Sequence, residues 1–449
     1  MEAEHWRPGS WRLRPASQQA EYPDSRALQE VLAELALCPP LVTSWEIELL
    51  RAQLADAAVG RRFLLQGGDC AERFDDCSDA VIKNRLKILL QMSVVLIYGM
   101  KKPVVRVGRF AGQYAKPRSS ATETRQGVTL PSYRGDIVNA PEFTASARSS
   151  DPARLLKAYH CSAMLLNFVR ALADGGFADL HFPEYWDLNF ADNSSHAEEY
   201  RQILGRVRDA LSFAEAASAR SITGVRRVDF FTSHEALHLH YEEAFTRAVP
   251  RRPGYYNLST HFPWIGKRTA HHTGAHVEYM RGIRNPIGVK VGPGTAPSEI
   301  VHLAKHLNPE NEPGRLTLIT RFGAAIIERE LPAHIAAIKT AGQHVLWCCD
   351  PMHGNTEQAA NGFKTRRFDN ILAELEMAFE IHARVGTILG GVHFELTGEN
   401  VTECTGGARG LVEADLSRAY LTSLDPRLNA EQSLEMALRI VQKCRQMGQ

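Results

Sequence analysis

The sequence predicts an α/β fold of the (β/α)₈ barrel type, and three observations support this prediction. Short β-rich runs alternate with longer helical stretches from about residue 60 to residue 400. The runs number eight, and most are nearly continuous in apolar residues, which is typical of parallel strands covered on both faces. No glycine-rich dinucleotide or phosphate-loop motif opens a helix, which disfavours the alternative of an open doubly wound sheet.

The predicted strands are bounded by polar or turn-forming residues, and helical periodicity fills the stretches between several of them. One such helix, within residues 149–176, has its own start signals, because Asp151 is a candidate N-cap and Pro152 suits the first helical position. Further helices are expected over residues 79–96 and 368–386. The eight strands are expected over residues 61–68, 103–109, 227–233, 255–262, 286–293, 315–323, 344–351 and 390–398.

Two segments exceed a minimal barrel. Residues 1–60 contain few strand signals and are expected to form an extension packed on the barrel, with helices over 25–37 and 43–58. Residues 61–449 would form the barrel itself, including a helical insertion at about 177–220. The insertion either covers the barrel or serves as an oligomer or regulatory element. One face of its predicted helix contains Ile203, Leu204, Val207 and Leu211.

The composition and net charge are those of an ordinary soluble protein. Of the 449 residues, 44% are hydrophobic and 23% are charged, and the net charge is +1, so neither nucleic acid nor a membrane surface is an expected partner. The amino terminus lacks the apolar core of a secretory signal, and the longest apolar stretch, residues 88–100, is too short to span a bilayer. The eight cysteines include no CxxC pair, which argues against a structural zinc ribbon. We therefore expect a cytoplasmic enzyme with free thiols.

Chemistry in barrels of this kind lies at the carboxyl ends of the strands. Each predicted strand of this chain contains near its end, or is followed by, a charged or metal-binding residue. Such groups are costly to bury in apolar surroundings without partners, so together they predict one shared polar pocket. In chain order they are Cys70, Arg109 with Lys116, Arg118 and Ser119, Glu235, Lys267 with Arg268, Lys290, Arg321, Asp350 with His353, and Glu395, with Asp425 shortly beyond the last strand.

Seven of these groups are cationic, which predicts substrates with more than one anionic group, because guanidinium and ammonium groups match phosphate and carboxylate oxygens. The simpler alternative for any single arginine is a salt bridge to a barrel helix. Lys290 fits a purely structural role least, since it interrupts the apolar strand IGVKVG. The cationic set is Arg109, Lys116, Arg118, Lys267, Arg268, Lys290 and Arg321.

A second set offers one sulfur, one nitrogen and two carboxylate donors, which suits a borderline divalent metal such as Mn²⁺, Fe²⁺, Co²⁺ or Zn²⁺ better than Mg²⁺ or Ca²⁺. Taken alone, Cys70 in LLQGGDCAERF is equally explained as a small buried residue after a turn at Gly67 and Gly68. HEALH (234–238) also matches the helical zinc motif HExxH, but it follows a strand directly and has no third ligand at a fitting spacing. The candidate ligands are Cys70, His353, Glu395 and Asp425.

Several segments of this sequence together resemble the type II 3-deoxy-D-arabino-heptulosonate 7-phosphate (DAHP) synthase family over almost the whole chain. That family catalyses the first step of the shikimate pathway to aromatic amino acids. The resemblance implies a (β/α)₈ barrel transferase that condenses phosphoenolpyruvate with erythrose 4-phosphate and releases phosphate. It rests on WRLRPASQQAEYPD (11–24), LLQGGDCAERF (64–74), GRFAGQYAKPRS (108–119), SYRGDIVN (132–139), TSHEAL (232–237), HFPWIGKRT (261–269), NPIGVKVGP (285–293), GRLTLITRFG (314–323), DPMHGNT (350–356), GFKTR (362–366), ELTGENVTEC (395–404) and DPRLN (425–429).

The resemblance also implies roles for individual residues. One divalent metal per chain, Mn²⁺ first with Co²⁺, Fe²⁺ or Zn²⁺ as alternatives, would be bound by Cys70, His353, Glu395 and Asp425. Phosphoenolpyruvate would be bound by Arg109, Arg268, Lys290 and Arg321, near Glu235 and Lys267, with Lys290 as the candidate proton donor. Erythrose 4-phosphate would be bound by Lys116, Pro117, Arg118 and Ser119.

Two positions depart from the family pattern. Lys267 stands in PWIGKRT where the family usually has Glu, which adds a positive charge beside the phosphoenolpyruvate phosphate. Leu424 stands where some members have a cysteine, so a disulfide switch with Cys70 is not expected. The stretch 196–218 resembles an insertion that the family links to feedback by aromatic amino acids and to oligomer contacts.

We therefore expect a feedback-regulated homo-oligomer, a dimer or a tetramer, with aromatic amino acids as effectors and chorismate mutase as a candidate partner. Two alternatives stay open. One is a related condensing enzyme of secondary metabolism, which Lys267 alone favours. The other is a catalytically silent partner of another enzyme, which the intact ligand and cation sets disfavour.

Overall fold

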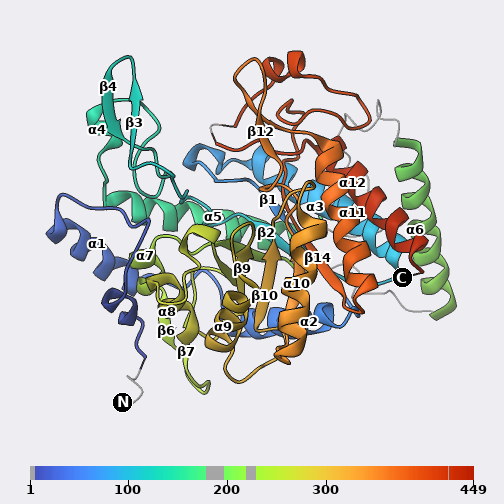
Figure 1. The fold of residues 1–449 in the computed structure, drawn as a ribbon, viewed down its shortest axis with the longest axis horizontal. Helices are drawn as coiled ribbons and strands as arrows, with labels where there is room; N and C mark the ends of the chain where they lie inside the picture. Colours follow the sequence, from blue (N-terminus) through green and yellow to red (C-terminus); the bar gives the residue numbers. More distant parts are fainter. Residues whose placement is uncertain (1–5, 178–196, 219–228, 423, 449) are drawn as a thin grey trace.

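The computed structural model describes residues 6–177, 197–218, 229–422 and 424–448, and a closed barrel lies at its centre (Figure 1). Within these ranges eight strands, each parallel to its neighbours, close the barrel in the order β1–β14–β11–β10–β9–β8–β5–β2. The predicted barrel is therefore confirmed. Its strands are β1 Phe63–Gly68, β2 Val104–Arg109, β5 Phe231–Glu235, β8 Phe262–Ile265, β9 Ile287–Val291, β10 Leu316–Thr320, β11 Leu346–Cys349 and β14 Leu389–Glu395.

Helices cover the outside of the barrel, and short antiparallel strand pairs extend three of its loops (Figure 1). The helices are α1 Ser25–Leu37, α2 Ser44–Ala58, α3 Asp79–Met100, α4 Ala145–Arg148, α5 Ala153–Asp174, α6 Ala197–Ser218, α7 Leu239–Ala244, α8 Ala275–Gly282, α9 Pro297–Leu307, α10 Ile327–Thr340, α11 Phe368–Arg384 and α12 Ala430–Gln446. The 3₁₀ turns are η1 Ser10–Leu13, η2 Phe74–Asp76, η6 Lys267–Thr269 and η7 Glu413–Arg418. The strand pairs are β3 Thr122–Arg125 with β4 Val128–Pro131, β6 Thr246–Ala248 with β7 Tyr255–Asn257, and β12 Thr356–Gln358 with β13 Lys364–Arg366.

Helix α2 of the amino-terminal region closes the lower end of the barrel, at the amino ends of the strands (Figure 1). A capping box starts this helix, because the Thr43 and Glu46 side chains accept hydrogen bonds from each other's backbone N–H groups at 3.3 and 2.8 Å. Since α2 fills this end with apolar side chains, the carboxyl ends of the strands are left for polar groups. The buried cluster that it forms with the barrel interior includes Leu50, Leu54, Ala57, Leu64, Val107, Phe262, Trp264 and Leu346.

The predicted helices agree with the structure to within a few residues at their ends, which is the usual uncertainty of a helix boundary. The helix of the insertion is α6, which packs against α3, and its Ile203 side chain is buried. Residues 178–196 and the end of the predicted insertion lie outside the described residues, as does the side chain of Leu211. None of the described helices is long and apolar enough to cross a membrane.

The fourth barrel strand lies further along the chain than the sequence predicts, so that boundary is wrong. The predicted range 255–262 overlaps β8 at its last residue, and its first three residues form β7 of a separate hairpin. Between the two strands the chain turns, and the Asn285 side chain donates to the carbonyls of Asn257 and Thr260 at 2.8 and 3.1 Å. Aromatic residues of high strand propensity stand on both sides of this turn, so propensity alone did not separate β7 from β8.

A buried arginine on α3 explains why acids flank the cysteine after β1. Arg85 forms ion pairs with Asp69 and with Glu72, the latter at 3.2 Å. The Glu72 carboxylate in turn accepts hydrogen bonds of 3.0–3.1 Å from the three backbone N–H groups of residues 111–113. These contacts fix the loop after β1, which contains Cys70, against the loop after β2.

Replacing Arg85 with Met should lower the free energy of unfolding by about 3–5 kcal/mol, because buried carboxylates would lose a charged partner. Denaturation in guanidinium chloride, followed by circular dichroism, measures the change. The matched control is Lys83→Met on the same helix, which breaks an exposed pair with Asp79 and should cost less than about 1 kcal/mol. Equal losses in the two variants would contradict a structural role for Arg85.

Candidate active site

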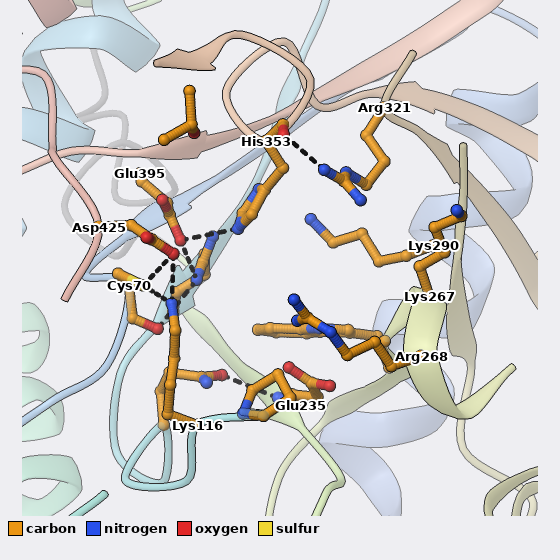
Figure 2. Close-up of a pocket in the computed structure, with 16 residues that line it drawn as sticks. Cys70, Lys116, Glu235, Lys267, Arg268, Lys290, Arg321, His353, Glu395 and Asp425 are labelled. Atoms are coloured by element: carbon orange, nitrogen blue, oxygen red, sulfur yellow. Dashed lines mark hydrogen bonds and ion pairs between the residues drawn. The ribbon is translucent and has the colours of Figure 1, made fainter. Parts of the chain in front are cut away.

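A cavity of about 350 Å³ opens at the carboxyl ends of the barrel strands. Figure 2 shows side chains from separate strands and loops pointing into it. Twelve of the residues that the sequence predicts for the site line this cavity, whereas Arg118, Ser119 and Asp350 do not. The twelve are Cys70, Arg109, Lys116, Pro117, Glu235, Lys267, Arg268, Lys290, Arg321, His353, Glu395 and Asp425.

One side of the cavity holds the candidate metal ligands. Donor atoms of Cys70, Glu395 and Asp425 all lie within 4.8 Å of one another. His353 lies beside them, with Nε2 3.1 Å from a Glu395 oxygen. The Lys116 ammonium contacts both Cys70 Sγ and the Asp425 carboxylate, so a positive group already lies where donors converge (Figure 2). The site therefore accommodates a cation, and its sulfur, nitrogen and carboxylate donors fit a borderline divalent metal.

The protonation of these groups follows from burial and mutual charge. Burial raises the pKa of the Cys70 thiol, and the Glu395 charge raises it further. Burial alone would lower the pKa of Lys116, but Cys70 and Asp425 outweigh burial and raise it. Burial alone would raise the pKa of Asp425, but Lys116 holds it below its ordinary value. Lys116 thus compensates the negative charge of the donor cluster.

Glu395, the last residue of β14, is fully buried at the centre of this charge network. Arg109 and Arg366 bind its two oxygens at 3.1 and 2.8 Å. Burial alone would raise the pKa of Glu395, but His353, Arg366 and Arg109 hold it well below its ordinary value. The side chain is therefore a carboxylate, as a metal ligand must be.

Lys290 and His353 meet at a shared acid. The Lys290 ammonium forms an ion pair with Asp350, and the same carboxylate lies 2.7 Å from His353 Nδ1. Burial lowers the pKa of Lys290, although Asp350 opposes this effect. The sequence places Asp350 at a strand end without giving it a role; the structure shows that it orients both a cation and a candidate ligand.

The opposite side of the cavity is positively charged. Lys267, Arg268 and Arg321 line it, and among the described residues no acid forms an ion pair with any of them (Figure 2). Arg321 is held in place by a hydrogen bond to the His353 carbonyl. Burial lowers the pKa of Lys267, and Arg321 and Arg268 lower it further. This surface suits a group with several negative charges.

Four residues that line the cavity each keep one buried polar atom without a hydrogen-bond partner in the described part of the chain. These atoms are Arg109 Nε, Arg321 Nε, Glu235 Oε1 and Glu395 Oε2, the last of which still forms an ion pair with Arg366. Burial also raises the pKa of Glu235. Because unpaired buried polar groups are costly, their presence around one cavity is typical of a site that a polar ligand completes.

The structure places the residues of the predicted loop 116–119 in different surroundings. Lys116 and Pro117 line the cavity, whereas Arg118 and Ser119 do not. Arg118 forms an ion pair with Glu123 at 2.8 Å and lines an adjoining cavity of about 320 Å³ that also contains Lys364. Ser119 is exposed.

Several residues that line the cavity are uncharged, so the pattern of charged strand ends does not identify them. Gln113, Trp264, Gly266 and Thr356 line the cavity, and they belong to the strings GQYAKPRS, HFPWIGKRT and DPMHGNT. Arg366 gives a charge signal, but its contact with Glu395 depends on the tertiary fold. The residue types in the sequence therefore predict the charged part of the cavity lining but not the neutral part.

Glu374 of α11 is a further residue that the sequence does not identify. Its carboxylate accepts hydrogen bonds from the Phe322 N–H at 2.8 Å and from Asn355 Nδ2 at 2.7 Å. It thereby ties together the loops that contain Arg321 and His353. Burial raises the pKa of Glu374 to about 7.

The structure excludes the zincin interpretation of HEALH. His234 and Glu235 end strand β5, whereas His238 is the N-cap of α7, so the motif does not lie on one helix. The two histidines also have different partners, since His234 Nε2 lies 2.7 Å from Glu242 and His238 Nε2 lies 2.7 Å from the Tyr22 hydroxyl.

In this parallel barrel the strand ends join sulfur, nitrogen and carboxylate donors to a cluster of cations that have no acidic ion-pair partner among the described residues. Such a site defines an enzyme for small anionic substrates. The model of the class-II DAHP synthetase family matches residues 6–441, and the chain belongs to that family. The resemblance seen in the sequence is thus confirmed, and membership makes the chain a transferase of the DAHP synthase type.

Individual proteins show the same similarity. A phospho-2-dehydro-3-deoxyheptonate aldolase of Streptomyces coelicolor is 50% identical over 436 residues, which cover 97% of each chain. One of Neurospora crassa is 47% identical over 457 residues, covering 98% of this chain and 95% of its own. A solved structure of such an enzyme from Francisella tularensis has a TM-score of 0.52 at 14% identity, covering 95% of this chain and 99% of that one, and it supports the fold alone.

Replacing Gly266 with Ala should lower kcat/KM on the order of a hundredfold, as expected when catalytic groups shift by about 1 Å. A Cβ atom at this position would lie 2.0 Å from Glu235 Oε1, so either the carboxylate or the loop with Lys267 and Arg268 must move. Steady-state kinetics measures the loss, and circular dichroism checks the fold. The control is Gly205→Ala in α6, where the added group would have no described atom within 4 Å apart from its chain neighbours and the backbone of its own helix. Full activity of the Gly266→Ala enzyme would contradict the assignment.

Proposed function

We propose that the chain condenses phosphoenolpyruvate with erythrose 4-phosphate in the strand-end cavity, with release of phosphate, and that it needs one divalent metal. The observation that supports this most is that a mixed donor cluster lies in the same cavity of about 350 Å³ as a cationic surface without an acidic ion-pair partner in the described part of the chain. Such a cavity can polarise an aldehyde at one side and hold a phosphorylated enol at the other. The names of the curated relatives support the same product.

Cys70, His353, Glu395 and Asp425 would hold the metal, with Mn²⁺ as the first candidate and Co²⁺, Fe²⁺ or Zn²⁺ as alternatives. When bound, the metal supplies Lewis-acid polarisation of the aldehyde oxygen. Arg109 and Arg366 keep Glu395 ionised for this task. Because the Lys116 ammonium contacts Cys70 and Asp425, a cation bound by these donors would free it for an anionic substrate group.

Phosphoenolpyruvate would bind on the cationic side of the cavity. Its phosphate and carboxylate together bear about three negative charges near neutral pH. Lys267, Arg268 and Arg321 match that charge without acidic competitors among the described residues, whereas Lys290 is already compensated by Asp350. The cations would orient the enol so that its methylene carbon attacks the aldehyde carbon, and much of the rate would come from this positioning.

After the carbon–carbon bond forms, water adds to the cationic second carbon and phosphate leaves from the resulting hemiketal. Lys290 is the proposed proton donor, because it lines the cavity and burial lowers its pKa. Asp350, which contacts both Lys290 and His353, would hold the ammonium in place. Glu235, whose pKa burial raises, lies next to the enol site as a second proton-binding group.

Erythrose 4-phosphate would place its phosphate at the loop of residues 116–119. Arg118 and Lys364 both line the adjoining cavity, which shares Lys116 and Asp425 with the main one. Two cations next to the donor cluster suit a substrate whose aldehyde faces the metal ligands. The exposed Ser119 adds nothing to this cavity in the described structure.

The remaining expectations stay predictions. They are a dimeric or tetrameric assembly, feedback by aromatic amino acids, chorismate mutase as a partner, a cytoplasmic location, and the division into an extension of residues 1–60 and a barrel of residues 61–449. A role in secondary metabolism has Lys267 as its one supporting residue. The catalytically silent alternative is disfavoured, because the ligand and cation sets meet in one cavity.

Replacing Cys70 with Ala should weaken metal binding at least tenfold and lower activity in parallel, because it removes the sulfur donor. The assay follows the ultraviolet absorbance of phosphoenolpyruvate, which should fall only with erythrose 4-phosphate present and not after treatment with a chelator. The control is Cys77→Ala, whose thiol lies outside the cavity and contacts the Cys161 carbonyl. Normal metal binding and turnover by the Cys70→Ala enzyme would refute the ligand set.

Replacing Lys267 with Glu should raise the KM for phosphoenolpyruvate roughly 10- to 100-fold and change kcat less, since a binding charge is inverted. The pH profile gives a second test. Lys267 is charged below its pKa, which is lowered, so kcat/KM should fall as pH rises through that value. Lys267→Arg stays charged and should move this alkaline limb to higher pH. Lys339→Met on α10 serves as a charge control. Unchanged KM and pH profiles would rule out the role.

A further inference from the structure

A second cavity, of about 470 Å³, lies on the outer side of the barrel next to α8 and α9. Helix α8 packs against both α9 and the amino-terminal turn η1. None of the described residues that line it also lines the active-site cavity. Its lining is mainly basic and includes Arg14, His272, Thr273, His302, Lys305 and His306.

The positive charge of this outer cavity is only partly compensated by the described residues. Its lining acid, Glu278, is bound in a bidentate pair by Arg281 at 2.7 and 2.8 Å, and it forms a longer ion pair of 4.0 Å with Arg14. Lys305 has no ion pair or hydrogen bond within the described ranges. Burial lowers the pKa of His306, and the Arg281 charge lowers it further although Glu278 opposes it, so this imidazole favours its neutral form. The positive charge therefore comes from Arg14 and Lys305, and these two cations attract an anion.

One wall of the outer cavity is connected to the active site through the amino-terminal segment. The carbonyl of Pro15, next to Arg14, accepts a hydrogen bond of 3.0 Å from the Ala275 N–H of α8. A little further along, the Gln18 side chain accepts from the Arg118 N–H at 2.9 Å and donates to the Arg118 carbonyl at 3.0 Å. The segment that contains Arg14 is therefore bonded directly to the predicted erythrose 4-phosphate loop.

The second wall of the outer cavity is also connected to the active site through the chain. His272 and Thr273 belong to the short connection between η6 and α8. Turn η6 contains Lys267 and Arg268, which line the active-site cavity. An ion that contacts both walls would therefore restrain both the loop that contains Arg118 and the turn η6.

We propose that this outer cavity is a regulatory site for a small anion with two or more negative charges on phosphate or carboxylate oxygens. Bound between Arg14 and Lys305, the anion holds the amino-terminal segment against α9 and thereby orders the loops at Arg118 and Arg268. The binding goes beyond the proposed function and does not depend on it. The effect on substrate loops rests on the proposed function.

The first test is a calorimetric titration of the metal-free protein with inorganic pyrophosphate. We expect two classes of site in the wild type. The double variant Arg14→Gln/Lys305→Gln should lose one class, with affinity at least tenfold lower, as removal of two contacting charges predicts. Arg268→Gln should lose the other class. The control Arg329→Gln, an exposed charge on α10, should keep both.

The second test is hydrogen exchange with and without pyrophosphate. In the wild type and in Arg268→Gln, pyrophosphate should slow exchange in residues 14–19, 116–119 and 268–273, and it should not do so in the double variant. His302→Gln should weaken the protection without affecting the fold, since this side chain is exposed. Wild-type binding and protection by the double variant would overturn the proposal. Loss of the outer class with Arg268→Gln unaffected would instead count against the proposed active site.

Discussion

The buried carboxylate of Glu395 is the constraint on which the site depends. An isolated carboxyl group at this depth would take up a proton, and it would then be a poor ligand for a metal. Arg109 from β2, Arg366 from β13 and His353 from the loop after β11 keep it ionised. These groups are far apart in the chain and meet only when the barrel is closed, so the fold and the charge state of this candidate ligand are coupled.

The cations of the site fall into two groups that differ in their partners. Arg109, Lys116 and Lys290 each contact an acid and balance the charge of the scaffold and of the donor cluster. Lys267 and Arg268 have no such partner among the described residues and remain available to substrate charge. Counting basic residues in the sequence cannot make this distinction, because it depends on which acids lie within reach after folding.

The barrel and most of its charged lining were predictable, since strand periodicity and strand-end residues are local features of the sequence. The boundary of β8 was not, because the Asn285 side chain, more than twenty residues away, satisfies the preceding turn. The roles of Asp350 and Glu374 were not predictable either. Each acts by joining two segments, and such a contact leaves no trace in composition or spacing.

The position of α2 has a consequence for how the chain reaches its native state. This helix is made before any strand, yet its apolar face packs against β1, β2, β11 and β14, and β1 and β14 are the first and last barrel strands. The barrel closes when β1 pairs with β14, where Leu64 lies opposite Gly391. This pairing can therefore form only after nearly the complete polypeptide has been made. Contacts so distant along the chain make for slow folding, and α2 can meanwhile shield the exposed lining of a half-built barrel from aggregation.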